Sequence, residues 1–397
     1  MDFDVVVIGA GPAGLSFAQA LSVGSVGAGQ TPLRIALIES QPEAALATPA
    51  FDGREIALTH FSARVLRELG MWDRFPAEAI SPLRDAKVLN GLSLQGMNIE
   101  HQHGNKDELG YLISNHLIRK AAYEAVKDSS NVTLICDAKV TDLRTDADGG
   151  TVTMADGRTL HASLLVAADS RFSAARRAMG IAARMHDFGK VMLVCQMEHD
   201  EPHEHVAWEW FDYGQTLALL PMNGNRSSVV LTLPQHEMQP LEAMSAEAFN
   251  DAITARFARR LGDMRLTSTR HCYPLVAVYA DRFVGKRFAL MGDAAVGMHP
   301  VTAHGFNFGL KGADTLARGM LKARASGSDF ASPTVLQAYE STHRRATLPL
   351  YLATHAVAKL YTSESLPSRV LRDAFLGIGQ RLTPFKRLVA ASLTGAH

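Results

Sequence analysis

Three glycines near the start of the chain have the spacing of a phosphate-binding turn. Gly9, Gly11 and Gly14 follow an apolar run over residues 5–8 and precede a segment of helical character. In a strand–turn–helix unit, the first glycine permits a tight turn, the second lets a pyrophosphate approach the backbone, and the third lets the helix pack on the strand. The free N–H groups at the helix start then face the phosphates. The pattern predicts a nucleotide site.

Three acidic side chains stand at the ends of predicted buried strands. Glu39 ends a strand over residues 34–38, and Asp169 and Asp293 each end a later apolar run. In a doubly wound parallel sheet, ligands bind outside the carboxyl ends of the strands, and an acid after the second strand accepts hydrogen bonds from a ribose hydroxyl. Together with the glycine turn, this arrangement predicts that the chain binds an adenine dinucleotide. A glycine turn that binds nothing is the alternative.

Length and composition describe a globular protein of more than one core. The chain has 397 residues, 47% of them hydrophobic, and its 40 basic residues balance 40 acidic ones. This length predicts two interleaved domains. The balanced charge argues against nucleic acid and against strong attachment to anionic lipid. We find no run of about 18 apolar residues and no signal peptide, so no membrane-spanning segment is expected. The cysteines have no spacing typical of a metal site or a disulfide, which predicts buried thiols in a reducing compartment.

Local patterns predict alternating helices and strands in the first half of the chain. Helices are expected over residues 12–21, 62–69 with Ser62 as a possible cap, and 114–126 with Ser114 as cap;. A polar loop is expected over 41–50, and a β excursion over 82–104.

The second half of the chain has a different pattern of predicted secondary structure. Residues 188–233 predict antiparallel strands with a hairpin across 222–225, and 246–261 predict an amphipathic helix;. From about residue 334 the chain reads as helical, with Pro349, Pro367 and Pro384 as breaks.

Several side chains have two interpretations. Arg54 is predicted either to pair with a cofactor phosphate or to hold its loop through a surface ion pair. His101 and His103 have a metal-ligand spacing on a strand, but no third ligand is evident, so a solvated strand end is favoured and no metal site is predicted. Trp208 and Trp210 share one face of a strand and wall an aromatic pocket or, more commonly for such residues, belong to the core.

The three strand-end motifs together resemble one family. The glycine turn with Glu39, Asp169 with Ser173 and Arg176, and Asp293 after its glycine are similar to the group A flavoprotein monooxygenases of the p-hydroxybenzoate hydroxylase type. Over its full length the chain resembles the ubiquinone-biosynthesis flavin hydroxylases (UbiH/UbiF/VisC type). The finer signals are three stretches, at residues 109–111, 292–301 and 371–386.

The departures from the family pattern cluster near the flavin-facing loop. Ser170 stands where the family has glycine, and Val296 stands where a histidine is usual. The usual Gly-Gln-Gly is Ala303-His304-Gly305 here. These departures resemble the UbiM-type branch of 5-demethoxyubiquinol hydroxylases, and they concern the choice of substrate and ring carbon more than the cofactor.

The resemblance implies an α/β fold in which a Rossmann-like FAD-binding domain is interleaved with an antiparallel-sheet substrate domain and followed by C-terminal helices. The expected FAD-binding domain comprises residues 1–80, 107–184 and 284–330. The expected β-sheet substrate domain comprises residues 81–106 and 185–283, and the C-terminal helical segment comprises 331–397.

The resemblance also implies a set of site residues. Those expected to bind FAD are Gly9, Gly11, Pro12, Ala13, Gly14, Glu39, Arg54, Asn115, Val140, Asp169, Asp293, Pro300, Gly305, Phe306 and Asn307. Those expected to line the substrate pocket are Trp208, Trp210, Pro221 and His304. Pro300 and His304 are expected to line the flavin loop, and no side chain is assigned as catalytic acid or base.

The activity implied by the resemblance is hydroxylation of the aromatic ring of a polyprenylated ubiquinone precursor, such as 5-demethoxyubiquinol. NAD(P)H reduces FAD, O₂ adds to form a flavin C4a-hydroperoxide, and the ring attacks the distal oxygen; the cofactor carries the chemistry. The alternatives are a non-catalytic flavin-binding member of a quinone-biosynthetic complex and a hydroxylase of another small phenol.

The expected location is the cytoplasm, held peripherally at the inner membrane among other ubiquinone-biosynthesis proteins. Residues 349–393 combine apolar positions with basic ones, which is the composition of a weak membrane-surface or partner-docking segment;. A structural role, in which these helices cap the flavin domain, is the alternative.

Overall fold

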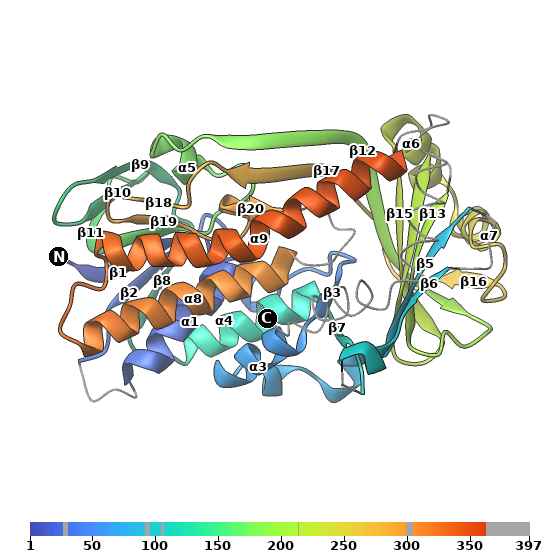
Figure 1. Cartoon of the computed structure of the whole chain (residues 1–397), viewed down its shortest axis with the longest axis horizontal. Coiled ribbons are helices and arrows are strands. Elements are labelled where there is room, and N and C mark those ends of the chain that lie inside the picture. The colour runs from blue at the N-terminus through green and yellow to red at the C-terminus, as the bar shows by residue number, and fades with distance from the viewer. Residues whose placement is uncertain (27–30, 92–95, 105–106, 213, 299–304, 363–397) are drawn as a thin grey trace.

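A computed structural model describes residues 1–26, 31–91, 96–104, 107–212, 214–298 and 305–362. Among these residues the strands form three sheets, and helices cover two of them (Figure 1). The α/β fold class predicted from the sequence is confirmed.

The first sheet is mainly parallel and carries the predicted nucleotide turn. Its path is β18-β19-β11-β1-β2-β8, and β10 and β9 extend it from β11. The strands are β1 (Phe3–Ile8), β2 (Ile35–Ile38), β8 (Val132–Ile135), β9 (Val140–Thr145), β10 (Gly150–Met154), β11 (Thr159–Ala167), β18 (Val284–Gly285) and β19 (Phe288–Leu290). β1 lies inside the sheet between parallel neighbours β2 and β11, and Val5, Val6 and Val7 are fully buried, as the continuous run of valines indicates;.

Seven helices of the described chain belong to the body built on the first sheet. They are α1 (Pro12–Val26), α2 (Glu43–Ala47), α3 (His60–Glu68), α4 (Asn115–Lys127), α5 (Ala174–Ala178), α8 (Gly305–Ala325) and α9 (Pro333–Thr362). Helix α8 packs along α1, and α9 lies over α8 (Figure 1). The buried side chains of these helices join those of the sheet in one large core.

The second sheet is small and stands between the other two. It consists of β3 (Glu55–Leu58), β7 (Gly110–Ser114) and β4 (Ser81–Leu83), all antiparallel. Short 3-10 segments lie nearby at Trp72–Arg74 and Ala77–Ala79.

The third sheet has nine strands and matches the predicted antiparallel region. They are β5 (Asp85–Asn90), β6 (Met97–Ile99), β12 (Ala183–His199), β13 (Val206–Asp212), β14 (Gln215–Pro221), β15 (Arg226–Pro234), β16 (Met264–Leu266), β17 (His271–Ala280) and β20 (Val296–Gly297). The predicted hairpin between β14 and β15 is confirmed, and the excursion at 82–104 supplies β5 and β6. Helices α6 (Gln235–Ala243) and α7 (Ala246–Arg256) cover one face.

Two long strands link the two bodies of the molecule. β12 and β17 pair with each other in both of their halves, with an irregularity between Asp187 and Val191. β12 runs from the body of the first sheet into the third sheet, and β17, which is antiparallel to it, runs back (Figure 1). The predicted domain boundary at residues 184 and 185 falls inside β12, so the exact division into domains stays a prediction.

The structure corrects several local predictions. Helix α1 continues to Val26, five residues beyond the expected end, because Gly24 leaves room for Leu321 of α8: a Cβ there would lie 2.2 Å from the leucine Cδ1. The cap of α3 is Thr59, whose side chain accepts from the Ser62 N–H, rather than Ser62 itself. Residues 41–50, expected as a loop, contain α2.

Further corrections concern proline and histidine. Pro349 lies inside α9 and does not end it, and the helix changes direction along its length (Figure 1);. Helix α6, which contains Pro240, was not predicted. His101 begins a 3-10 segment, His101–Gly104, in which its Nδ1 lies 2.7 Å from Asp85 Oδ1.

Candidate functional site

The glycine turn has the geometry that its spacing predicts. Gly9 has φ +102°, and a Cβ there would lie 2.6 Å from the carbonyl oxygen of Ala168. A Cβ on Gly14 would lie 2.0 Å from the carbonyl oxygen of Gly9, so only glycine lets α1 approach the strand this closely. Gly11 differs, because a Cβ there would meet no protein atom within 4 Å. Gly11 therefore faces the space in which a pyrophosphate would lie against the backbone.

The start of α8 comes close to the same turn. Pro12 is the first residue of α1, a position that needs no N–H donor;. A Cβ on Gly292, which has φ +57°, would lie 2.9 Å from the Cβ of Ala13, and one on Gly309 of α8 would lie 3.5 Å from it. The fold thus brings Ala13, the Gly292 turn and α8 together.

Three neighbouring hydrogen-bond donors hold the carboxylate of Glu39. Its Oε2 accepts from the Ala10 N–H at 2.8 Å, and its Oε1 accepts from the Gln41 N–H at 3.0 Å and from Ser40 Oγ at 3.1 Å. The Ala138 N–H donates to the Glu39 carbonyl at 2.9 Å. Val140, predicted to bind FAD, begins β9 two residues after Ala138. The carboxylate is oriented at the end of β2, where a ribose is expected.

Asp169 stands at the end of β11 with an unsatisfied oxygen. Its Oδ1 is buried and has no hydrogen-bond partner among the described residues, while Oδ2 accepts from the Ala175 N–H at 3.4 Å. Arg176, which is 2% exposed, donates from Nη1 to the Ala294 carbonyl at 2.8 Å. A buried carboxylate oxygen without a donor is costly, so this atom indicates a donor from a bound group.

Asp293 lies in the 3-10 turn η4 (Gly292–Ala294) and pairs with a cation that the sequence did not single out. Arg171 Nη2 donates to Asp293 Oδ2 at 2.9 Å, and Arg171 Nη1 donates to the Val276 carbonyl at 3.0 Å. The side chain of Asp293 is 38% exposed, which leaves Oδ1 able to accept from a ligand.

Arg54 forms an ion pair within the protein. Its Nη2 lies 2.5 Å from Asp52 Oδ2, and its guanidinium lies 5.3 Å from the ring centroid of Tyr273. Asn115 Nδ2 donates to the same Asp52 oxygen at 2.7 Å. Although burial opposes ionisation, the hydrogen bonds from Arg54 and Asn115 hold the pKa of Asp52 below its ordinary value. Of the two interpretations of Arg54, the ion pair is present in the structure; a phosphate contact stays a prediction.

Asn307 uses its side chain to fix the start of α8. Its Oδ1 accepts from the Thr59 N–H at 3.0 Å and from Ser62 Oγ at 2.7 Å, and its Nδ2 donates to the Ala57 carbonyl at 2.8 Å. Phe306 packs against the core of the first body, and Gly305 begins the helix. The predicted loop residues Pro300 and His304 lie outside the described residues.

The faces of the third sheet differ. Side chains alternate along a strand, so residues 193, 195 and 197 of β12 point to α6 and α7, and residues 192, 194 and 196 point to the body built on the first sheet, which we call the FAD-binding body after the domain predicted from the sequence;. We call these the helix face and the inner face. On the inner face, Gln196 Nε2 donates to Glu55 Oε1 at 2.9 Å, and the Tyr273 hydroxyl donates to the Asp52 carbonyl at 2.8 Å.

Trp208 and Trp210 lie on the helix face. Trp210 is 2% exposed, its Nε1 donates to the Gly91 carbonyl at 2.6 Å, and its ring contacts that of Phe257. Trp208 packs against the same core. Along β14, alternation places Pro221 on the same face as Leu217 and Leu219 of that core. The core interpretation replaces the predicted placement of the two tryptophans in the substrate pocket, because β13 turns them away from the FAD-binding body. The placement of Pro221 in the pocket stays a prediction.

A buried carboxyl joins the small sheet to the inner face. Glu55 of β3 accepts from Ser114 Oγ at 2.5 Å as well as from Gln196. Burial raises the pKa of Glu55 to about 7, against the effect of both hydrogen bonds. Ser114 precedes α4 as predicted, but its hydroxyl is used here and makes no capping bond to the helix.

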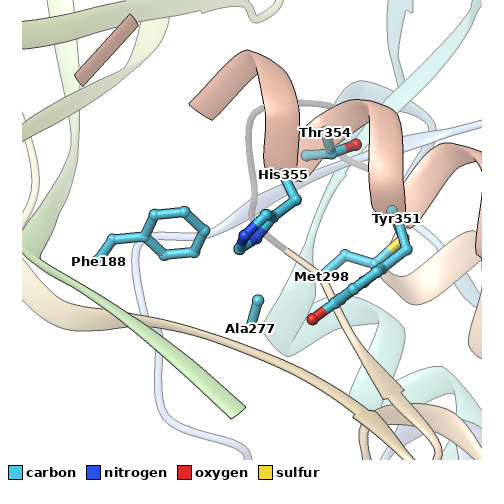
Figure 2. A pocket seen from close by; sticks show the side chains of 6 residues that line it. All are labelled: Phe188, Ala277, Met298, Tyr351, Thr354 and His355. Carbon is cyan, nitrogen blue, oxygen red and sulfur yellow. The ribbon is translucent and has the colours of Figure 1, made fainter. Parts of the chain in front are cut away.

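A small aromatic pocket lies where α9 meets the long strands. Its lining is shown in Figure 2 and comprises Phe188, Ala277, Met298, Tyr351, Thr354 and His355. His355 points toward Phe188, and its ring centroid is 4.6 Å from that of His186. These contacts attach the C-terminal helix to β12 and β17.

The described residues fit an adenine dinucleotide such as FAD. Gly11 leaves backbone open to a pyrophosphate, Glu39 is oriented for a ribose, and Asp169 has an oxygen that needs a donor. Arg171, Glu55, Ser114 and Gln196 were missed by sequence reasoning. Of these, only Arg171 carried a signal, since it lies two residues after the strand-end acid Asp169.

Comparison with known proteins agrees with this geometry. The family model described as FAD binding domain matches residues 2–349. The chain is 46% identical over 396 residues to ubiquinone hydroxylase UbiM of Neisseria meningitidis, covering 99% of this chain and 84% of that one. It is 34% identical to ubiquinone hydroxylase UbiL of Rhodospirillum rubrum, covering 97% and 88%.

A solved structure supports the fold. That of p-nitrophenol 4-monooxygenase PnpA from Pseudomonas putida superposes with a TM-score of 0.76 at 20% identity, covering 100% of this chain and 99% of that one. The chain belongs to the FAD-binding-domain family of flavoproteins, within which ubiquinone hydroxylases are its relatives. The predicted family and the predicted cofactor, FAD, are confirmed.

Proposed function

We propose that this protein is an FAD-dependent monooxygenase that hydroxylates the aromatic ring of a polyprenylated ubiquinone precursor, such as 5-demethoxyubiquinol. The observation that carries the proposal is 46% identity to a ubiquinone hydroxylase over 99% of the chain. The geometry of the glycine turn and the placement of Glu39 and Asp293 at strand ends support the cofactor part of the proposal.

The cofactor supplies the redox chemistry when bound, taking electrons from NAD(P)H and activating O₂. The protein binds and orients it. The turn at Gly9–Gly14 would hold the pyrophosphate, Glu39 would accept from the ribose, and Asp293 would accept from the adjoining part of the cofactor.

The remaining task of the chain is to hold the aromatic ring in a dry space beside the flavin. The N–H groups at the start of α8 direct a positive dipole end toward that space, and Asn307 fixes the position of this helix;. The inner face of the third sheet forms the opposite wall. We propose that His304 and Phe306 tune where the ring sits.

The described residues contain no helix long and apolar enough to cross a membrane. We propose that the protein reaches its poorly soluble substrate by peripheral attachment at the membrane or to other ubiquinone-biosynthesis proteins. The segment that motivates this, residues 349–393, lies mostly outside the described residues. Deleting residues 365–397 should abolish quinone formation in cells while the purified protein keeps its FAD; loss of FAD on deletion would indicate a structural role instead.

The test of the function is a quinone profile. A bacterial host that lacks its own ring hydroxylases should accumulate precursor, and expression of this chain should convert the precursor to ubiquinone, measured by mass spectrometry. Gly14→Val, which cannot form the turn, is the control and should leave the precursor unchanged. Unchanged precursor with the flavin-loaded wild-type chain would contradict the proposal.

A further inference from the structure

Glu209 is a partly buried acidic side chain on the inner face of the third sheet. Glu209 stands between Trp208 and Trp210 on β13, and those two rings lie on the helix face, so the carboxyl points the other way;. Its cross-strand neighbours are Val88 on β5 and Ala218 on β14. Ala218 is followed across the sheet by Val230 and then Val194.

The row that contains Glu209 is less covered than its flanking rows. Val88, Glu209, Ala218 and Val230 are all partly exposed. The flanking rows mix buried and partly exposed side chains. In the row on one side Ala207 and Ser228 are buried, and in the row on the other side Phe211, Thr232 and Met192 are buried. The other members of these two rows are partly exposed: Ala86, Leu220, Gln196, Asn90 and Thr216. The inner face therefore has a partly exposed apolar band around the Glu209 carboxyl.

This band faces the FAD-binding body. Val194, at the end of the row, contacts Gly53: a Cβ on that glycine would lie 2.8 Å from Val194 Cγ2. Tyr273 and Gln196, on the same face in the flanking rows, bond to Asp52 and Glu55 of that body. Strands lie about 4.8 Å apart, so Glu209 stands three strands, or about 14 Å, from Val194.

The carboxyl of Glu209 has no hydrogen-bonding or ion-pair partner among the described residues. The other partly buried acids described above, Glu39, Asp52 and Glu55, all have donors. Burial among apolar groups raises the pKa of Glu209 to about 8. A carboxyl placed this way costs stability, so a role for the core alone does not account for it.

We infer that Glu209 is a specificity-determining residue that accepts a hydrogen bond from a ring hydroxyl of the aromatic substrate. The inference rests on the proposed function for the identity of the substrate as a phenol or quinol. The ring would lie on the apolar band of Val88, Ala218 and Val230, and its hydroxyl would donate to the carboxyl.

The chemistry of the group suits this role. A carboxyl oxygen accepts a hydrogen bond in both the ionised and the protonated form, so recognition does not depend on which form is present. A hydrogen bond to such a group in a poorly solvated site distinguishes a ligand that has the hydroxyl from one that lacks it, because the latter leaves the carboxyl unpaired.

The test compares two ligands that differ only in whether the second ring oxygen carries a hydrogen or a methyl group. Holoprotein is titrated with 2-methoxyphenol and with 1,2-dimethoxybenzene, and binding is followed by calorimetry and by the change in flavin absorbance. Wild type should bind the phenol roughly tenfold to a hundredfold more tightly than the ether. Glu209→Leu should reduce this preference to less than about threefold, and Glu209→Gln, which keeps a carbonyl acceptor, should retain part of it.

The control is Glu198→Gln, which alters an exposed acid at the end of β12 in the same sheet and should keep the wild-type preference. An unchanged preference in Glu209→Leu, with FAD content intact, would overturn the inference, as would equal binding of the two ligands by wild type. Because the measurement is of binding, it distinguishes failure here from failure of the proposed hydroxylation, which the quinone profile reports.

Discussion

The nucleotide side and the substrate side of this molecule differ in how their acidic groups are satisfied. Glu39 accepts three hydrogen bonds from neighbouring protein groups within 3.1 Å. Glu209, on the inner face of the third sheet, accepts none from the described residues. Glu39 is therefore oriented before any ligand arrives. Glu209 has no such donor, and on the nucleotide side only Asp169 Oδ1, among the acids described above, shares this lack of a partner.

The largest expected effect concerns the rigidity of the nucleotide side. Gly14→Ala places a Cβ 2.0 Å from the Gly9 carbonyl oxygen, so α1 must move away from β1. We expect a loss of roughly 3 kcal/mol or more in the free energy of unfolding and no bound FAD. Denaturant unfolding and the flavin spectrum of the purified protein measure both.

Gly11→Ala is the matched control for that change. The added Cβ meets no protein atom within 4 Å, so the fold should keep its stability while FAD is lost, because the methyl group occupies the approach of the pyrophosphate;. Equal destabilisation by both substitutions would contradict the distinction between a packing glycine and a ligand-facing glycine.

The next effect concerns the contact between the two sides and depends on pH. The folded-state pKa of Glu55, about 7, lies above the ordinary value of 4.5, so the native protein holds this proton more tightly. Stability from this group is fully present below about pH 4.5 and is lost as pH rises through about 7. Glu55→Gln, which stays neutral, should become more stable than wild type by up to about 3 kcal/mol at pH 8 and by little at pH 5. Thermal unfolding across pH measures this, and a difference that does not vary with pH would be the contrary result.

A third change tests the cofactor contact of Asp293. Replacing Asp293 by Ala should weaken FAD binding by about 1–3 kcal/mol, the value of a hydrogen bond to a charged group, measured by flavin release on dilution. The substitution also frees Arg171, so Arg171→Met is the comparison variant. If the two variants release FAD equally, the ion pair rather than the carboxylate explains the loss.

The smallest effect is expected for Arg54→Met. This ion pair with Asp52 is partly exposed, so its loss should lower the free energy of unfolding by less than about 1 kcal/mol;. Arg64→Met, which breaks a surface pair with Glu68, is the control for stability. A tenfold weaker binding of FAD in Arg54→Met alone would support the phosphate contact that the sequence left open.

The same two sides differ in how far the sequence predicts them. The nucleotide turn was predictable because Gly9, Gly11 and Gly14 act within one strand–turn–helix unit, and strand-end acids follow from local apolar runs. Alternation along β13 showed that Trp208 and Trp210 share a face. It could not show which face the helices cover, since that depends on α6, an unpredicted helix with a proline inside it.

Long-range contacts explain the other misses. Gln196 and Glu55 are 141 residues apart and meet only because β12 extends from one body to the other. Ser114 was predicted as a cap from its position before α4, but the tertiary contact with Glu55 takes its hydroxyl. Nothing in the local sequence of either residue indicates these partners.

The most direct test of the proposed activity is the source of the new oxygen atom. Purified holoprotein with NAD(P)H is incubated with a short-chain 5-demethoxyubiquinol analogue under ¹⁸O₂, and the product is examined by mass spectrometry. We expect a ring-hydroxylated product that carries one ¹⁸O atom. An ¹⁸O-free hydroxylated product, or flavin-loaded protein that consumes NAD(P)H and O₂ without altering the ring, would contradict it.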